Sequence, residues 1–439
     1  MLQKVKNAFK LKEIRQRIIF TLLMLVVIRI GSQIPMPGVD SDFFGEWLES
    51  TVGSSNLGFF DAVTGGSFEN MSIFALNITP YITSSIIMQL LTIAIPKIEE
   101  MHKDGEEGRK KITKITRYLT VALSLAEALA MVIGFGSAGY LPDYDWFHVI
   151  MAVAALTAGS TILMWFGERI TEKGVGNGIS IVLTINIISR LPSDLQSVWE
   201  QFVMGKEIQN MILYGAVIVV ICLAVIILVV VLQGAERHIP VQYSRKMFAS
   251  KMTGANSSHI PLKINTAGVI PIIFAQSIMM FPVIIAQLIG KSDAGGVVGW
   301  IFNMLTQSNW CDPSNPSYSV GLAIYILLII AFAYFYTSIT FNPMEIADNM
   351  KKSGGFIPGI RPGKPTSDYL QQMLNYIIFI GAVGLSIVSV IPIFFEGFFN
   401  ASISFGGTSL IIIVGVIIET LKQIDSQMLV RNYSGFLSD

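Results

Sequence analysis

The sequence has little charge for its length. Only 14% of its 439 residues are charged, whereas a soluble globular protein carries about 25%. Hydrophobic residues make up 52% of the chain, and the mean hydropathy is +0.61. These values exclude an ordinary soluble domain and indicate a protein that crosses a membrane several times. The formal net charge is +0, so bulk charge favours neither nucleic acid nor an acidic partner.

Cysteine and histidine are also scarce, with two and four residues. Cys222 lies in an apolar run and Cys311 in a polar loop, so they predict neither a disulfide framework nor a metal site. No histidine is placed at membrane depth opposite a serine, as an intramembrane protease would require. Gly290-Lys291-Ser292 lacks the upstream glycine of a phosphate-binding loop. We therefore expect no enzymatic activity, no cofactor and no ATP hydrolysis by the chain itself.

Long apolar runs are what the sequence does contain. Ten runs, each roughly 15–24 residues long, approach the ~20 residues that a helix needs to cross a bilayer. They cover residues 16–34, 73–95, 115–137, 147–167, 177–191, 211–233, 266–289, 318–340, 369–391 and 406–424. The expected fold class is therefore an all-α polytopic membrane protein with ten transmembrane helices.

Lysine and arginine gather in alternate loops between these runs. The segments on the side of the two chain ends hold 26 of the 30 Lys and Arg residues, and the opposite loops hold three. The remaining one, Arg29, lies inside the first run. Cytoplasmic loops carry the excess of positive charge, so we expect both termini in the cytoplasm. No small-residue cleavage site follows the apolar residues 18–30, which favours a retained helix over a signal peptide.

Ten spans divide into two sets of five, although no strong internal repeat is visible. An inverted-repeat architecture is compatible with this count. The predicted organisation is an N-terminal half at 1–191, an external connector at 192–210, a C-terminal half at 211–424 and a cytoplasmic tail at 425–439.

Residues 73–91 are unusually polar for a segment at membrane depth. A helix that faced only lipid would leave these polar groups without partners. Ile78 and Ile82 lie one turn apart, and Ser85 and Gln89 continue the same stripe. One interpretation is an apolar constriction in an aqueous path. The other is a buried helix in which Ser and Thr allow close packing.

A short segment at 56–68 follows the first run on the external side. It is too short to span a membrane, but it could re-enter from outside as a mobile stopper or lie on the outer surface. Three apolar residues share one face of its predicted helix and two glycines would end it: Leu57, Phe60 and Val63, then Gly65 and Gly66.

Two long basic loops lie on the cytoplasmic side. Loop 234–265 reads as two strands around a Gly/Asn turn and carries Arg237, Arg245 and Lys246. These charges could meet RNA phosphates or an acidic protein, or they could serve only as a topology signal.

Loop 341–368 predicts a short helix followed by an exposed tip. Asn342 is placed to cap the helix, Pro343 to begin it, and glycine to end it. Prolines and glycines should hold Arg361 and Lys364 in a non-helical tip, which is either a docking surface for a cytoplasmic partner or a solvated connector.

Glu127 supports an alternative function. Ion-coupled transporters use ionisable groups inside the membrane, so a secondary transporter of small solutes would depend on Glu127. The structural interpretation of the same residue is a packed, hydrogen-bonded carboxyl group.

Four motifs together resemble one known family. SIFALNITPYITSSIIMQLL, TAGSTILMWFGERITEKGVGNGIS, LKINTAGVIPIIFAQSI and FNPMEIADNMKKSGGFIPGIRPGKPT are similar to signature regions of SecY, the bacterial protein-conducting channel of the Sec translocon. The resemblance covers essentially the whole chain. It implies two pseudo-symmetric five-helix halves around a central pore, with a short re-entrant plug helix.

The resemblance also implies roles for particular residues. Seven candidates would supply an apolar pore ring of about six: Ile78, Ile82, Ile179, Leu183, Ile270, Ile273 and Ile412. The plug would be roughly 57–66, with Leu57, Phe60, Val63, Gly65 and Gly66. Gln89 and Gln276 are candidates for a lateral gate between helices 2 and 3 and helices 7 and 8. The docking residues would be Arg237, Arg245, Lys246, Arg361 and Lys364.

The implied function is a gated passive conduit for unfolded secretory and membrane proteins in the bacterial cytoplasmic membrane. The implied partners are the small membrane subunits SecE and SecG, the SecA ATPase motor, the ribosome, polypeptides that bear signal sequences, and the lipid bilayer. The chain departs from the family at three positions: Asn77 replaces a frequent Gly, Thr79 a frequent Met, and Leu183 a common Ile.

Overall fold

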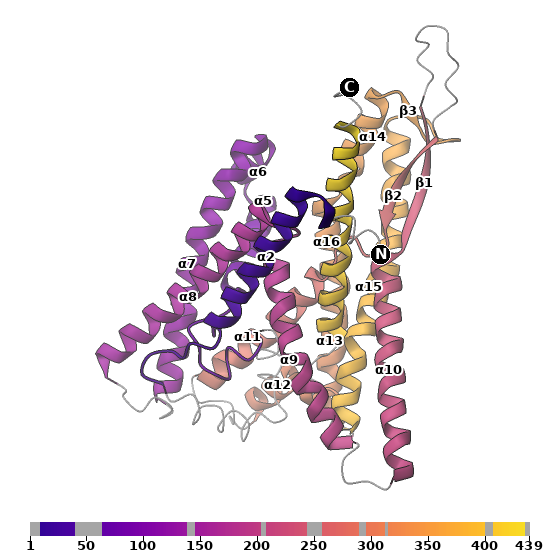
Figure 1. The fold of residues 1–439 in the computed structure, drawn as a ribbon. Coiled ribbons are helices and arrows are strands. Elements are labelled where there is room, and N and C mark those ends of the chain that lie inside the picture. The colour runs from indigo at the N-terminus through magenta and orange to yellow at the C-terminus, as the bar shows by residue number, and fades with distance from the viewer. Residues whose placement is uncertain are drawn as a thin grey trace, which may run out of the picture.

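The computed structural model describes residues 9–39, 64–137, 145–202, 208–243, 257–288, 296–311, 315–399 and 407–434. Most of these residues are helical, which confirms the predicted fold class. In Figure 1 the helices of the first part of the chain and those of the second part form two groups, and α9 (Gly178–Phe202) lies between them. A small sheet projects at one end.

Each of the ten predicted runs overlaps one helix of the described residues. The first five are α2 (Lys12–Gly31), α5 (Thr79–Ala94), α7 (Gly105–Ser137), α8 (Trp146–Lys173) and α9. The second five are α10 (Ile208–Gly234), α11 (Ile270–Leu288), α13 (Ser319–Thr340), α15 (Lys364–Phe399) and α16 (Gly407–Ser434).

Length and apolar composition identify fewer of these helices as spans. Among the described residues, four helical stretches are long and apolar enough to cross a membrane: Gly105–Gly136, Trp146–Lys173, Pro316–Lys352 and Lys364–Phe394. A fifth is obtained if α5 and the following helix α6 (Pro96–Lys103), which meet at a bend of 107°, count as one broken span. The count of ten spans therefore stays a prediction.

Each group of helices has its own apolar core. In the first group, residues 68–76 pack with α7 and α8 around Phe68, Met71 and Leu156. In the second, α10, α11, α13, α15 and α16 pack around Trp310 and Tyr325, which are almost fully buried. Since close packing of such side chains favours helix association in a membrane, each group is stabilised by a core of its own.

The last helix, α16, joins the two groups. It packs against α9 on one side and α10 on the other. Its residues Ile412 and Val416 share an apolar cluster with Ile187 of α9. Near its other end, Ile424 packs with Ile14 at the start of α2. The seam between the groups is thus lined by aliphatic side chains.

The structure corrects the predicted start of the second span. Residues 73–78 form turns, and the helix begins only at Thr79. Pro80 gives the reason, because proline lacks an N–H and its ring clashes with the carbonyl four residues earlier in a helix. Asn77 also adopts a left-handed conformation, with φ of 52°, which interrupts a right-handed helix. The backbone of Ile82 still donates to Ile78, at 3.1 Å, so these two residues keep the predicted one-turn spacing.

Three segments expected as loops or tips are helical. Residues 96–117 contain α6 and the first turns of α7, where Glu106 pairs with Lys110 at 2.9 Å; such i,i+4 pairs support a polar helix that apolar periodicity does not reveal. Residues 290–317 contain α12 (Val297–Leu305). Lys364, expected in a non-helical tip, is the first residue of α15.

The fifth helix is longer than predicted. It continues to Phe202, into the range assigned to the connector 192–210. Polar residues favour this extension, since the Gln196 side-chain amide donates to Glu200 one turn later, at 2.8 Å. Pro192 lies inside the helix, which continues for ten residues beyond it.

Residues 64–78 form an irregular segment that is buried against helices. Non-helical backbone at membrane depth is tolerated only where protein surrounds it and satisfies its polar groups. Here the amide of Ile73 donates to the carbonyl of Ile34 at 3.0 Å, and the amide of Met36 donates to that of Met71 at 2.8 Å. The segment that leads to Ile78 is therefore fixed by backbone pairing with the chain just after α2.

Gly159 of α8 allows this segment to lie directly on the helix. A Cβ added at Gly159 would overlap the carbonyl oxygen of Ile73. We expect Gly159→Ala to lower the free energy of unfolding by about 1–3 kcal/mol, because the backbone must move to relieve the overlap. Thermal unfolding of the purified protein in detergent measures this effect.

Gly215→Ala in α10 is the matched control. A Cβ there would make only an ordinary contact, 3.9 Å from Trp199, so its unfolding midpoint should stay unchanged or rise. Equal midpoints for the two variants would contradict the close approach of residue 73 to α8.

The small sheet links loop 234–265 to loop 341–368. Strand β1 (Glu236–Tyr243) begins directly after α10 and pairs antiparallel with β2 (Ser257–Lys263), which confirms the predicted hairpin. Strand β3 (Gly355–Phe356), from the second loop, pairs with the other edge of β1. Ile239 and Val241 of β1 are buried against α14 (Pro343–Lys352) and α15. The two basic loops therefore form one structural unit.

Candidate functional site

Four of the seven pore-ring candidates share one apolar cluster. Ile78, directly before α5, and Leu183 of α9 are buried in it, and Ile82 and Ile179 pack against it from the same two elements. Gly167 of α8 faces two of them, because a Cβ there would lie 3.0 Å from Ile179 Cγ1 and 3.4 Å from Ile78 Cδ1. The beginnings of α5 and α9 are thus brought together over a glycine of α8.

The other three candidates come from the second group of helices. Ile412 of α16 is buried against Ile187 of α9, at the seam between the groups. Ile270 and Ile273 lie half-buried at the start of α11. Of the seven aliphatic candidates, four thus lie at the beginnings of α5 and α9, two at the start of α11, and one at the contact of α9 with α16. A ring of apolar side chains from both groups remains an interpretation of this placement.

The plug candidates are only partly within the described residues. Leu57, Phe60 and Val63 lie outside them. Gly65 and Gly66 are described, and both have positive φ, of 69° and 79°. Since glycine adopts this conformation without steric cost, the pair is suited to end a helix, as the sequence predicts.

Gly65 also makes a close contact that the sequence does not reveal. A Cβ at Gly65 would lie 2.7 Å from the carbonyl oxygen of Asn186 on α9. The Gly65 carbonyl accepts hydrogen bonds from Arg29 Nη1 at 3.2 Å and from Ser189 Oγ at 3.5 Å. Residue 65 is therefore held by both α2 and α9.

Further polar contacts join the irregular segment 64–78 to α9. Glu69 forms an ion pair with Arg190, and Asn186 Nδ2 donates to Asn77 Oδ1 at 3.1 Å. Sequence reasoning missed Asn186, Ser189 and Glu69 as site residues. An asparagine within the apolar run 181–188 was the available signal, because such a residue at membrane depth needs a polar partner.

The two lateral-gate candidates do not meet. Gln276 of α11 is buried and its Nε2 donates to Gln307 Oε1 at 3.2 Å, within the second group of helices. Gln89 lies half-buried on α5. The first and second groups do approach each other here, since α11 contacts α7. A lateral gate between these helices stays a prediction.

Three of the five docking candidates lie within the described residues. Arg237 is exposed on β1, and Arg361 is exposed in the non-helical segment before α15. The carbonyl of Arg361 accepts from Thr366 Oγ1 at 2.8 Å, which fixes the backbone of the tip. Lys364 is exposed at the start of α15, whereas Arg245 and Lys246 lie outside the described residues.

An ion pair ties the base of the hairpin to α16. Lys422 of α16 binds the carboxylate of Glu236, the first residue of β1. The hydrogen bond from Lys422 holds the pKa of Glu236 below its ordinary value. The attraction is therefore present at neutral pH and is lost only as acid protonates the carboxylate. Because Lys422 is half exposed, the pair contributes at most about 1 kcal/mol.

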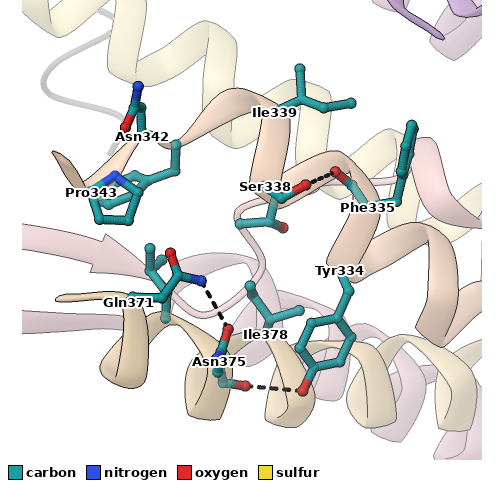
Figure 2. A pocket seen from close by; sticks show the side chains of 12 residues that line it. Tyr334, Phe335, Ser338, Ile339, Asn342, Pro343, Gln371, Asn375 and Ile378 are labelled. Atoms are coloured by element: carbon teal, nitrogen blue, oxygen red, sulfur yellow. Dashed lines mark hydrogen bonds between the residues drawn. The ribbon is translucent and has the colours of Figure 1, made fainter. Parts of the chain in front are cut away.

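A pocket opens beside loop 341–368, between the end of α13 and the first turns of α15 (Figure 2). Its volume is about 590 Å³. Tyr334 donates from its hydroxyl to the carbonyl of Asn375 at 3.1 Å, and Gln371 Nε2 donates to Asn375 Oδ1 at 3.2 Å. Asn342 also lines it and caps α14 through the amides of Met344 and Glu345. Its lining has no carboxylate, histidine or cysteine, so it offers no acid–base pair for catalysis.

Together these features define a polytopic helical membrane protein in which two helix groups meet along an apolar seam. The family model of SecY matches residues 72–421. Curated relatives of the same name, protein translocase subunit SecY, are 43% identical to the chain in both Streptomyces scabiei and Bacillus subtilis strain 168. Each alignment covers 100% of this chain and 100% of the relative. The chain belongs to the SecY family.

Solved structures support the same fold. The structure of a protein-conducting channel is similar to this chain, with a TM-score of 0.63 and 19% identity. The match covers 94% of this chain and 93% of that channel chain. A SecY structure with a plug domain matches 97% of both chains with a TM-score of 0.61 and 19% identity. Membership of this family argues against the alternative of a solute transporter. We therefore assign no transport role to Glu127, which is half-buried on α7.

Proposed function

We propose that this chain is the central channel subunit of the general secretory translocase. It acts as a gated, passive conduit for unfolded secretory proteins across the membrane and for membrane proteins into it. The observation that carries this function is the full-length relation to SecY translocase subunits, together with aliphatic side chains at the beginnings of α5 and α9 and at the contact of α9 with α16. An apolar constriction dewets, so it limits ion flow while a polypeptide can pass.

The proposed pore ring consists of Ile78, Ile82, Ile179, Leu183, Ile270, Ile273 and Ile412, with one of the seven outside a ring of about six. The proposed plug is the segment 57–66, which closes the resting channel from the external side. A signal sequence would leave sideways, between α5 and α7 on one side and α11 and α13 on the other. The contact of α7 with α11 supports this position for the gate.

The energy for transport comes from partners in this proposal, since the sequence has no phosphate-binding loop. The partners are SecE and SecG in the membrane, the SecA motor and the ribosome on the cytoplasmic side, and polypeptides bearing signal sequences. Related Sec61 and Ssh1 channels have been solved bound to ribosomes. The shared sheet supports a single docking unit made of both basic loops.

The proposed location is the bacterial cytoplasmic membrane, with both termini in the cytoplasm. The support is the 26 to three division of Lys and Arg between the two sets of loops. This orientation places the sheet and α14 on the cytoplasmic side, and Gly65 on the external side of the seam.

A photo-crosslinking amino acid at Ile82 tests the conduit. During export of a preprotein arrested in transit, we expect a crosslink between position 82 and the arrested polypeptide, because Ile82 would contact the passing chain. The crosslinked product is measured by its mass on a denaturing gel and by detection of the preprotein.

Ile227 is the matched control position. It is an exposed aliphatic residue of α10, at 63% exposure, and it should crosslink to lipid or a membrane partner but not to the preprotein. Absence of a preprotein crosslink at Ile82, with export arrested and confirmed, would argue against a conduit at this site.

A further inference from the structure

Asn186 of α9 lies where two functional segments meet. On one side its backbone touches Gly65, at the end of the proposed plug, closely enough that a Cβ on the glycine would not fit. On the other side its side chain donates to Asn77, which precedes the ring candidate Ile78. Asn186 is only 3% exposed and Asn77 is fully buried. One residue of α9 therefore contacts both the plug end and the approach to the ring.

The hydrogen bond between the two asparagines is buried at membrane depth. In such surroundings a polar pair is held together because lipid and apolar side chains offer no substitute partner. Asn186 Oδ1 finds no hydrogen-bond partner among the described residues, so the Nδ2 donor alone orients this side chain. Losing the acceptor on Asn77 would leave the Asn186 amide without its observed contact.

The backbone of Asn77 makes the pair unusual. Its φ of 52° is in the left-handed region, which Asn tolerates better than most residues and Gly tolerates fully. Glycine would satisfy this backbone equally well. The asparagine side chain is therefore not required by the backbone, and its contact with Asn186 is an additional interaction of this chain.

We propose that Asn77 and Asn186 form a polar clasp that favours the closed channel. The clasp consists of the hydrogen bond between them and the contact of Asn186 with Gly65. It holds the end of the plug and the start of α5 on the same position of α9, so both must be released together when the channel opens. Asn77 and Asn186 are positioning residues here, since they act through the plug and the ring. The inference rests on the proposed function.

The hydrogen bonds of Arg29 and Ser189 to the Gly65 carbonyl add to the same attachment. They hold the backbone of residue 65 but do not reach Asn77. The clasp differs from them because it connects the plug end to the segment that carries Ile78. Loss of the clasp should therefore affect closure more than loss of the hydrogen bonds to residue 65 alone.

The variants Asn77→Gly and Asn186→Ala test the clasp. Asn77→Gly keeps the left-handed backbone and removes the acceptor, and Asn186→Ala removes the donor. In this proposal the hydrogen bond is made only in the closed state, so its loss should raise the open fraction about fivefold. We expect each variant to raise the resting ion conductance of the intact translocase in a planar bilayer by about this factor. The double variant should conduct no more than either single one, because both remove the same bond.

Ser160→Ala is the matched control. Ser160 is a fully buried residue of α8 in the same helix group, and it makes no contact that enters the clasp. Its resting conductance should equal that of the unmodified protein. Thermal unfolding of every variant in detergent separates altered gating from a loss of stability.

Three results would overturn the clasp. The first is unchanged conductance in both single variants. The second is an equal rise in Ser160→Ala, or a rise that only follows a lower unfolding midpoint. The third is a double variant whose effect is the product of the single effects. The Ile82 crosslink keeps these outcomes separate from the proposed function: a crosslink with unchanged conductance removes only the clasp, whereas a missing crosslink removes the conduit itself.

Discussion

Deletion of residues 57–63 is expected to raise the resting ion conductance of the reconstituted translocase by on the order of tenfold or more. In the proposed function this segment closes the channel from the external side, so its removal leaves only the apolar ring as a barrier. The deletion retains residues 64–66, whose contacts with Arg29 and α9 fix the chain next to it. The conductance is measured in planar bilayers with no preprotein present.

A seven-residue change elsewhere on the same side provides the control. Replacing residues 138–144, between α7 and α8, by glycine and serine alters a connection of the same length that the proposed orientation also puts on the external side. This variant should keep the low resting conductance. If the deletion of 57–63 also leaves the conductance low while export continues, the segment is not a plug.

Arg361→Glu is expected to reduce motor-driven translocation by on the order of tenfold. Arg361 is exposed on a tip whose backbone is fixed by Thr366, so a reversed charge would face an approaching partner directly. An acidic surface on the motor would then be repelled rather than attracted, which mainly slows association. The measurement is ATP-dependent import of a preprotein into vesicles containing the translocase and SecA.

Two further variants define the origin of this effect. Arg361→Lys keeps the charge and should retain most of the transport. Lys110→Glu reverses an exposed charge on the α7 extension, in the other helix group, and should have little effect. Normal import by Arg361→Glu, at equal protein levels in the membrane, would contradict a docking role for this tip.

The long helices could be predicted from the sequence because each buries or exposes a continuous apolar surface. The hairpin was also predicted, since IPVQY and SSHIPLK are separated by a Gly/Asn turn and have strand composition. The cap at Asn342 was recognisable for a similar local reason: its side chain bonds to amides two and three residues later. All of these features depend on residues close together in the chain.

The features that were missed depend on polar or distant contacts. The first turns of α7 are stabilised by charge pairs such as Glu106 with Lys110, which apolar periodicity does not detect. The two residues of β3 are too few to give a strand signal. The bond between Asn77 and Asn186 joins residues 109 positions apart. The sequence showed two asparagines in apolar surroundings, but only the fold brings them together.

The position of α16 has a consequence for the synthesis of the protein. This helix is the last of the chain, yet it supplies the aliphatic residues that cover Ile187 of α9 and Ile14 near the start of α2. A chain emerging from the ribosome can pack α2, α5, α7 and α8 early, because their cores lie within the first part. The apolar contact of α16 with α9 and α2, however, forms only after residue 407 has been made. Until then the nascent protein has an open seam in the membrane, which other membrane components must cover.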